Sequence, residues 1–147
     1  MKRIIMLTLL ILSLVLVGCA SGGTAETPPE PKAVTLIATD IAYDIEQIDV
    51  SAGQTVELTL DNQGVLDHDF TIVEIPLTGE VETIEAAGEM EGHDVEHAAE
   101  ENDVHIAAPT ADQGTIAFAP AAPGEYIYYC TVSGHREAGM EGVLVVK

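Results

Sequence analysis

Three side chains that bind soft metal ions lie close together near the end of the chain, between Cys130 and Met140. Four residues separate Cys130 from His135, and another four separate His135 from Met140. A thiolate, an imidazole and a thioether form a donor set that suits copper better than zinc, calcium or magnesium. The spacing therefore predicts a metal site in this loop, with copper as the ion that fits it.

A blue-copper centre also needs a second histidine, because its metal lies among two imidazoles and one thiolate, with a weak axial ligand that is usually methionine. The best of the five histidines for this role is His68, which stands in a turn that leads into the apolar run Phe70–Ile75. We therefore expect Cys130 to bind as thiolate, His68 and His135 as neutral imidazoles, and Met140 as the long axial ligand.

One upstream histidine followed by a Cys–His–Met loop near the chain end resembles the cupredoxins, the small blue-copper proteins, over about residues 34–147. The stretches Pro123–Cys130 and Ala138–Val146 are similar to plastocyanin, whereas the longer gap between Cys130 and His135 is more similar to rusticyanin or auracyanin. The subfamily stays open. The resemblance implies an all-β Greek-key β-sandwich of two antiparallel sheets that holds one mononuclear type 1 copper.

The four expected donors leave no position for a substrate, which favours outer-sphere electron transfer over catalysis. The chain is thus expected to be an electron carrier and not an enzyme. The resemblance implies that the edge of His135 passes the electron to a c-type cytochrome, a terminal oxidase or another copper protein through a small transient interface.

Asp69 departs from the family pattern, in which many members carry asparagine after the first histidine to tie the two ligand loops together. An aspartate can still accept hydrogen bonds from the backbone of the Cys130 loop or from Thr131. Its charge near a thiolate would have to be offset. We expect Asp69 and Thr131 to support the site from behind its ligands.

The elements that must position these residues are short runs with alternating apolar side chains, separated by turn residues such as Ala52-Gly53 and Asp61–Gly64. Many short strands indicate a β-sandwich or barrel. In the run before Cys130, alternation places Tyr126 and Tyr128 on the cysteine's face as ordinary core aromatics. The predicted strands are 34–39, 45–50, 55–60, 70–75, 113–118, 125–130 and 142–147.

An acidic insertion at about residues 76–104 interrupts this pattern and is expected to form a helical or irregular flap. If it is helical, His93 and His97 share a face and could hold a secondary metal ion, but a solvated acidic segment with incidental histidines is the more ordinary reading. We expect His105 to be a strand residue and not a ligand.

The N-terminus is typical of a secretory signal, because Lys2 and Arg3 precede the apolar run Ile4–Val17. The ending Leu16-Val-Gly-Cys19 resembles the bacterial lipobox, which implies cleavage after residue 18 and lipidation of Cys19. An ordinary signal peptide or an uncleaved anchor are the alternatives. Residues 19–33 read as a flexible tether, and the domain is expected in the periplasm or on the outer cell surface. With Cys19 lipidated, Cys130 has no disulfide partner.

The chain is strongly acidic, with 5 basic and 25 acidic residues and a formal net charge of −20. Loss of Lys2 and Arg3 with the signal would leave −22. Such a charge disfavours nucleic acid and anionic lipid as partners and would steer basic proteins toward the surface, although it can also serve solubility alone. We expect a monomer that contacts the membrane only through its lipid.

Two other function classes remain open at this point. A copper-binding or delivery lipoprotein would use the acidic His93/His97 flap to capture metal. An immunoglobulin-like binding module would carry the donors by accident. A dinuclear copper centre is disfavoured, because the loop has Gly134 where a second cysteine would be needed.

Overall fold

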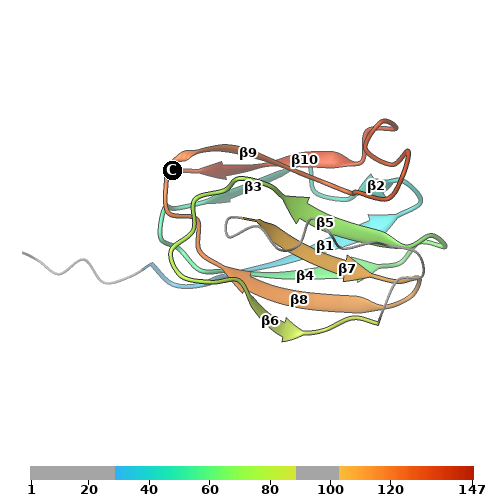
Figure 1. Ribbon diagram of the computed structural model, residues 1–147, viewed down its shortest axis with the longest axis horizontal. Coiled ribbons are helices and arrows are strands. Elements are labelled where there is room, and N and C mark those ends of the chain that lie inside the picture. Colours follow the sequence, from blue (N-terminus) through green and yellow to red (C-terminus); the bar gives the residue numbers. More distant parts are fainter. Residues whose placement is uncertain (1–28, 89–102) are drawn as a thin grey trace, which may run out of the picture.

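The computed structural model describes residues 29–88 and 103–147, which form two five-stranded sheets packed face to face (Figure 1). Within these residues there is no helix that could span a membrane. Residues 1–28, including the expected signal and Cys19, lie outside the described part of the chain. The strands are β1 (Lys32–Thr39), β2 (Ala42–Tyr43), β3 (Gln47–Val50), β4 (Val56–Asn62), β5 (His68–Ile72), β6 (Glu82–Glu85), β7 (Val104–Ala108), β8 (Gln113–Phe118), β9 (Gly124–Tyr129) and β10 (Glu141–Val146).

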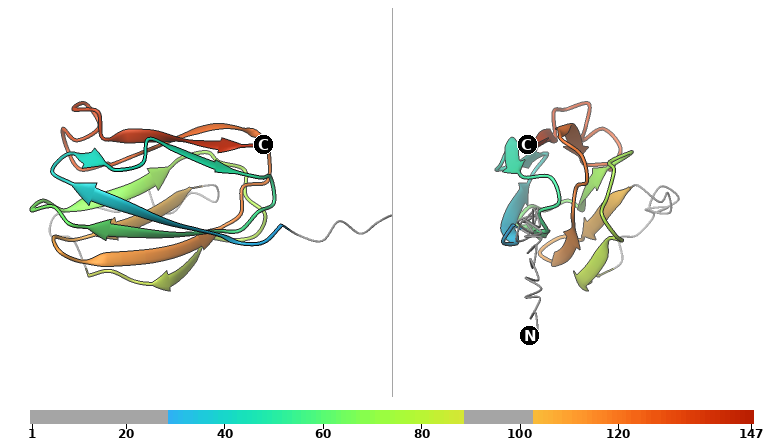
Figure 2. Two further views of the ribbon diagram at one scale, coloured as in Figure 1. Left: turned by 180° about the vertical axis from the view of Figure 1, so that it is seen from behind. Right: turned by 90° about the vertical axis from the view of Figure 1, so that its left-hand side faces the viewer.

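The strand order is β2-β1-β4-β8-β6 in one sheet and β3-β10-β9-β5-β7 in the other. The predicted all-β sandwich is confirmed. Most neighbouring strands are antiparallel, but β1 pairs with β4 and β3 pairs with β10 in parallel, so both sheets are mixed. The two views of Figure 2 show the layers from behind and from one end.

The core lies between the sheets and follows from the period-two alternation of apolar residues. Along β4, for example, Val56, Leu58 and Leu60 are buried while the side chains between them are not. The ring of Tyr128 stacks on Phe70 at a centroid distance of 5.1 Å and lies 5.6 Å from Tyr43. The expected inward face of β9 is thus occupied by core aromatics, with Cys130 buried directly after them.

Two strands were not expected from the sequence. β2 has only two residues, and β6 consists of four exposed residues inside the acidic insertion. β7 begins at the end of that insertion, in the stretch where a strand was expected around His105. The described part of the insertion therefore contains strand and no helix, while residues 89–102, with His93 and His97, lie outside the described residues. His105 is a strand residue of β7, as expected.

Gly142 on β10 leaves room for the ring of Tyr128, because a Cβ atom at position 142 would overlap that ring. The ring is held in place, since the Tyr128 hydroxyl donates a hydrogen bond to the carbonyl of Ile45. Gly142→Ala should therefore lower the free energy of unfolding of the apoprotein by about 1–3 kcal/mol, as overpacked cores do. Urea unfolding measures this, and Glu141→Ala on the exposed neighbour is the control. Equal stability of Gly142→Ala and the wild type would show that the ring can move aside.

Candidate metal centre

His68 is brought to the site by the connection between β4 and β5, and the buried side chain of Asn62 holds that connection together. Asn62 Nδ2 donates to the carbonyls of Leu66 (2.8 Å) and Ala108 (2.9 Å), and its Oδ1 accepts from the N–H of Gly64 (3.0 Å). A buried amide with its hydrogen bonds satisfied fixes one arrangement of the backbone around it. The first residue of β5 therefore enters the site in a defined position.

The second group of donors lies in the loop from Cys130 to Met140, between β9 and β10. Residues 135–140 form a single turn closed by two hydrogen bonds, from Met140 N to His135 O (3.0 Å) and from Gly139 N to Arg136 O (2.9 Å). This is the Schellman arrangement, which requires a left-handed residue, and Gly139 supplies it with φ of 100°. A further bond from Cys130 N to Met140 O (3.1 Å) closes the base of the loop.

These connections bring His68, Cys130 and His135 together as a buried cluster whose ligand atoms all lie within 4.8 Å of one another. Cys130 Sγ lies 3.9 Å from His68 Nδ1 and 3.4 Å from His135 Nδ1. Met140 is fully buried at the end of the same loop. One thiolate, two imidazoles and a methionine sulfur are the donor set of a type 1 copper site, and the residues present fit that ion.

The two histidines differ in their access to solvent. His68 is 0% exposed, whereas His135 keeps 6% of its surface in contact with solvent. Nδ1 of each ring faces the sulfur. A neutral imidazole that offers Nδ1 to a metal carries its proton on Nε2. In His68 that Nε2 is buried and has no hydrogen-bond partner among the residues described.

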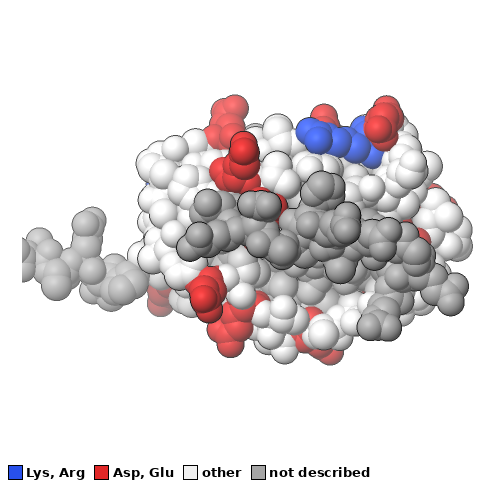
Figure 3. Space-filling model, viewed as in Figure 1, with Lys and Arg blue, Asp and Glu red and all other residues white. Residues whose placement is uncertain are grey.

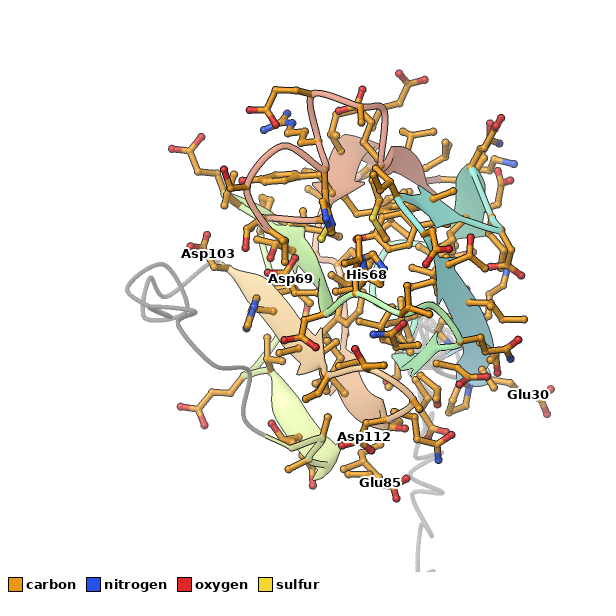
Figure 4. All side chains as sticks on the ribbon, turned by 90° about the vertical axis from the view of Figure 1, so that its right-hand side faces the viewer. Glu30, His68, Asp69, Glu85, Asp103 and Asp112 are labelled. Atoms are coloured by element: carbon orange, nitrogen blue, oxygen red, sulfur yellow. The ribbon has the colours of Figure 1, made fainter. Side chains whose placement is uncertain are left out.

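Asp69 follows His68 on β5 and lies beside the start of the Cys130 loop (Figure 4). Its Oδ1 accepts a hydrogen bond from the N–H of Thr131 at 2.6 Å, and its Oδ2 accepts one from the Thr131 hydroxyl. The backbone carbonyl of Asp69 accepts a hydrogen bond from the Tyr43 hydroxyl. A carboxylate thus connects the two ligand-bearing segments, at the position where the sequence led us to expect such a link.

Burial and hydrogen bonding act in opposite directions on Asp69. Burial raises the pKa of the carboxyl, but the hydrogen bonds from His105 and Thr131 outweigh it and hold the pKa below its usual value. For Cys130, burial and the nearby charge of Asp69 raise the pKa of the thiol to about 12. The apoprotein therefore holds a protonated thiol at neutral pH, and metal binding must release that proton.

The buried His68 makes the stability of the apoprotein depend on pH. Burial and the neighbouring His135 lower the pKa of His68, so the unfolded chain takes up a proton near pH 6.5 that the folded chain resists. The contribution of neutral His68 to the free energy of unfolding is fully present above that pH. It is lost as the pH falls through the lower pKa of His68 in the folded protein. Urea unfolding of the apoprotein at pH 7.5 and 5.5 should show this loss, and His68→Gln should reduce it. An unchanged slope in that variant would contradict the assignment.

The face of the molecule drawn in Figure 3 carries scattered acidic groups and one cluster of basic atoms at its upper edge. Of the five basic residues, Arg136 is the one that belongs to the Cys130 loop. Its guanidinium lies 3.9 Å over the ring centroid of Tyr129 and 3.4 Å from Glu141. Arg136 thus places one positive charge on the loop, where Glu137 of the loop and the adjacent Glu141 supply negative ones.

Nothing in the sequence indicated that three residues near the metal centre support it. Asn62 was visible only as a turn residue, Tyr43 lies in a two-residue strand, and His105 was expected to be a plain strand residue. Each reaches the site through a contact between residues distant in the sequence. His93 and His97 lie outside the described residues, and their role as a secondary metal site stays a prediction.

The fold and the donor set define a small copper-binding β-sandwich, a cupredoxin. The family model for copper binding proteins of the plastocyanin/azurin family matches residues 32–147, and the chain belongs to that family. Its cofactor is copper.

Known proteins similar to this chain include an auracyanin, a plastocyanin and a copper-resistant cuproprotein. Auracyanin-A of Chloroflexus aurantiacus is 28% identical over 161 aligned positions, covering 99% of this chain and 97% of the relative. Plastocyanin of a Synechococcus species is 30% identical over 145 positions, covering 95% and 91%. The copper-resistant cuproprotein CopI of Rubrivivax gelatinosus is 29% identical over 129 positions, covering 86% and 73%.

Among solved structures, the blue copper protein auracyanin A from Chloroflexus aurantiacus superposes with a TM-score of 0.57 at 24% identity. The match covers 80% of this chain and 99% of that one. This likeness confirms the cupredoxin fold.

Proposed function

We propose that the protein is a type 1 copper electron carrier that exchanges single electrons between extracytoplasmic redox partners. The observation that carries the proposal is the buried cluster of His68, Cys130 and His135, whose donor atoms already lie within 4.8 Å of one another. Bound copper supplies the one-electron couple between Cu(II) and Cu(I). Donors fixed by Asn62 and by the closed turn before Met140 need to move little between the two states, which suits electron transfer.

Electron exchange would take place at the end of the sandwich where His135 reaches the surface. Exposed apolar side chains belong to the loops of the same end, with Val65 and Leu66 in the connection between β4 and β5 and Ile41 between β1 and β2. The N–H of Val65 donates a hydrogen bond to Asp40 at 3.0 Å, which joins these two loops. A small apolar patch beside the one histidine ligand that keeps some contact with solvent suits a small, transient interface.

The partner class follows from chemistry and charge. A c-type cytochrome, a terminal oxidase or another copper protein would supply or accept the electron, and the formal charge of −20 favours a basic one. Stopped-flow reduction of the Cu(II) protein by a basic cytochrome c should be fast at low salt and slow down as ionic strength rises. An acidic cytochrome of similar potential is the control. If both cytochromes react at the same rate at every ionic strength, charge steering is refuted.

Lipidation of Cys19 and a place on the extracytoplasmic side of a membrane belong to the same proposal. The supporting observations are the Leu16-Val-Gly-Cys19 motif and the basic start at Lys2 and Arg3. Expression with labelled palmitate should label the wild type and leave Cys19→Ser unlabelled and released from the membrane. Label on Cys19→Ser would refute the anchor.

A second candidate is copper capture and delivery, favoured by the similarity to the copper-resistant cuproprotein CopI. In this case the acidic insertion would be needed to take up copper. Replacing residues 89–102 by a Gly/Ser linker of the same length separates the two functions, because it removes His93 and His97 and keeps the connection between β6 and β7. The electron-carrier proposal expects copper uptake and the rate of electron exchange to stay unchanged, whereas slower uptake with a normal blue spectrum would favour delivery.

A further inference from the structure

We propose that His105 is a positioning residue of the copper centre, which holds Asp69 against Thr131 and thereby helps to set the reduction potential. The inference concerns the copper centre on which the proposed function rests. The contact between the two side chains allows a carboxylate to lie close to the thiolate. Neither part of this pair is a copper ligand.

The register of the sheet brings the two side chains together. β5 and β7 are antiparallel, with Thr71 opposite His105 and Asp69 opposite Ala107, so His105 lies diagonally across from Asp69 on the same face. A diagonal pair is within reach only of a long side chain, and imidazole is long enough. His105 Nε2 lies 3.5 Å from Asp69 Oδ2.

The burial of the two side chains makes this contact matter. Asp69 is 0% exposed and His105 is 15% exposed. A buried carboxylate is costly unless several donors surround it. The Thr131 N–H and hydroxyl and the His105 imidazole provide donors from two different segments, the Cys130 loop and β7. His105 lies on β7, which carries none of the expected copper ligands. Its contact with the Asp69 carboxylate therefore does not depend on the metal.

Asp69 is linked to two of the expected copper ligands, His68 and Cys130. It follows His68, and its partner Thr131 follows Cys130. A negative charge at this place stabilises Cu(II) relative to Cu(I) and lowers the reduction potential. A donor on the far side of the carboxylate draws part of that charge away. His105 should therefore raise the potential relative to a centre with an unsupported Asp69.

The test is a double-mutant cycle on Asp69 and His105, with the reduction potential as the first measurement. Asp69→Asn should raise the potential, making reduction about tenfold more favourable, which is 59 mV for a one-electron couple. His105→Leu should lower it, and His105→Gln, which keeps a donor, should stay close to the wild type. In the Asp69→Asn background, His105→Leu should have no further effect.

The second measurement is urea unfolding of the same four apoproteins, which needs neither copper nor a redox partner. His105→Leu should destabilise the wild type, because it leaves a buried carboxylate short of a donor, and should cost less in the Asp69→Asn background. This readout stands even if the protein turns out to deliver copper. Should His105→Leu fail to fold, the double variant is expected to fold, since it lacks the unsupported carboxylate.

Several results would overturn the inference. His105→Leu with an unchanged potential and unchanged stability would show that the contact has no consequence. Equal effects of His105→Leu in both backgrounds would show that His105 acts in some way other than through Asp69. Failure of both His105→Leu and the double variant to fold would assign His105 to the packing of β7 alone.

Discussion

Replacement of Cys130 by serine should remove the intense visible absorption of the copper-loaded protein. The colour of a type 1 site comes from charge transfer between a cysteine thiolate and Cu(II), and a hydroxyl cannot provide it. Cys130 is the one free cysteine among the described residues, so no other described side chain can take its place. We expect the absorbance near ~600 nm to fall on the order of tenfold or more, to the weak level of ordinary Cu(II) complexes.

The serine is nearly isosteric, so the fold should survive the change. Circular dichroism of the apoprotein is the check, and Ser133→Ala, an exposed substitution in the same loop, is the matched control. A serine variant that kept its full absorption would place the chromophore elsewhere and refute the donor set.

The two histidines should respond differently when their rings are removed and imidazole is added to the solution. His135→Gly should lose the blue absorption and regain it with excess imidazole, because His135 reaches the surface and its removal opens a path to the metal. His68→Gly should also lose it but regain little, since His68 is fully buried.

The measurement is a titration of each Cu(II)-loaded variant with imidazole, followed at the blue band. Electron exchange of the rescued His135→Gly protein should be slower than that of the wild type, because a free imidazole is not fixed by the loop. Equal recovery by both variants would show that burial does not separate the roles of the two rings. Recovery by His68→Gly alone would show that His68, and not His135, is the ligand with access to solvent.

The donor set could be predicted from the sequence because it depends on residue type and local spacing. Cys130, His135 and Met140 lie within one loop, and the turn that places them is encoded locally, down to the left-handed Gly139. His68 was harder to predict as a ligand, because the sequence contains five histidines. The turn before an apolar strand was the signal that selected it.

The fold class was also accessible, because alternation along strands such as β4 and β8 is a strong local pattern. β6 was missed because its four residues are all exposed and carry no alternation. The parallel pairing of β1 with β4 and of β3 with β10 could not be predicted from the sequence, because strand order depends on the whole sandwich.

The support around the site was the least predictable part. The link from Asp69 to Thr131 was expected by resemblance, but the contact from His105 to Asp69 depends on the register between β5 and β7. The hydrogen bonds of Asn62 likewise join its own turn to the distant end of β7 at Ala108. Such contacts appear only when the strands are paired.

One type 1 copper that carries single electrons should be held by Cys130, His68, His135 and Met140. The most direct test is the visible spectrum of the protein loaded with one equivalent of Cu(II), recorded before and after ascorbate and again after reoxidation. We expect an intense band near ~600 nm that bleaches on reduction and returns on oxidation. A weak, broad band without thiolate charge transfer would contradict it and would place the copper elsewhere.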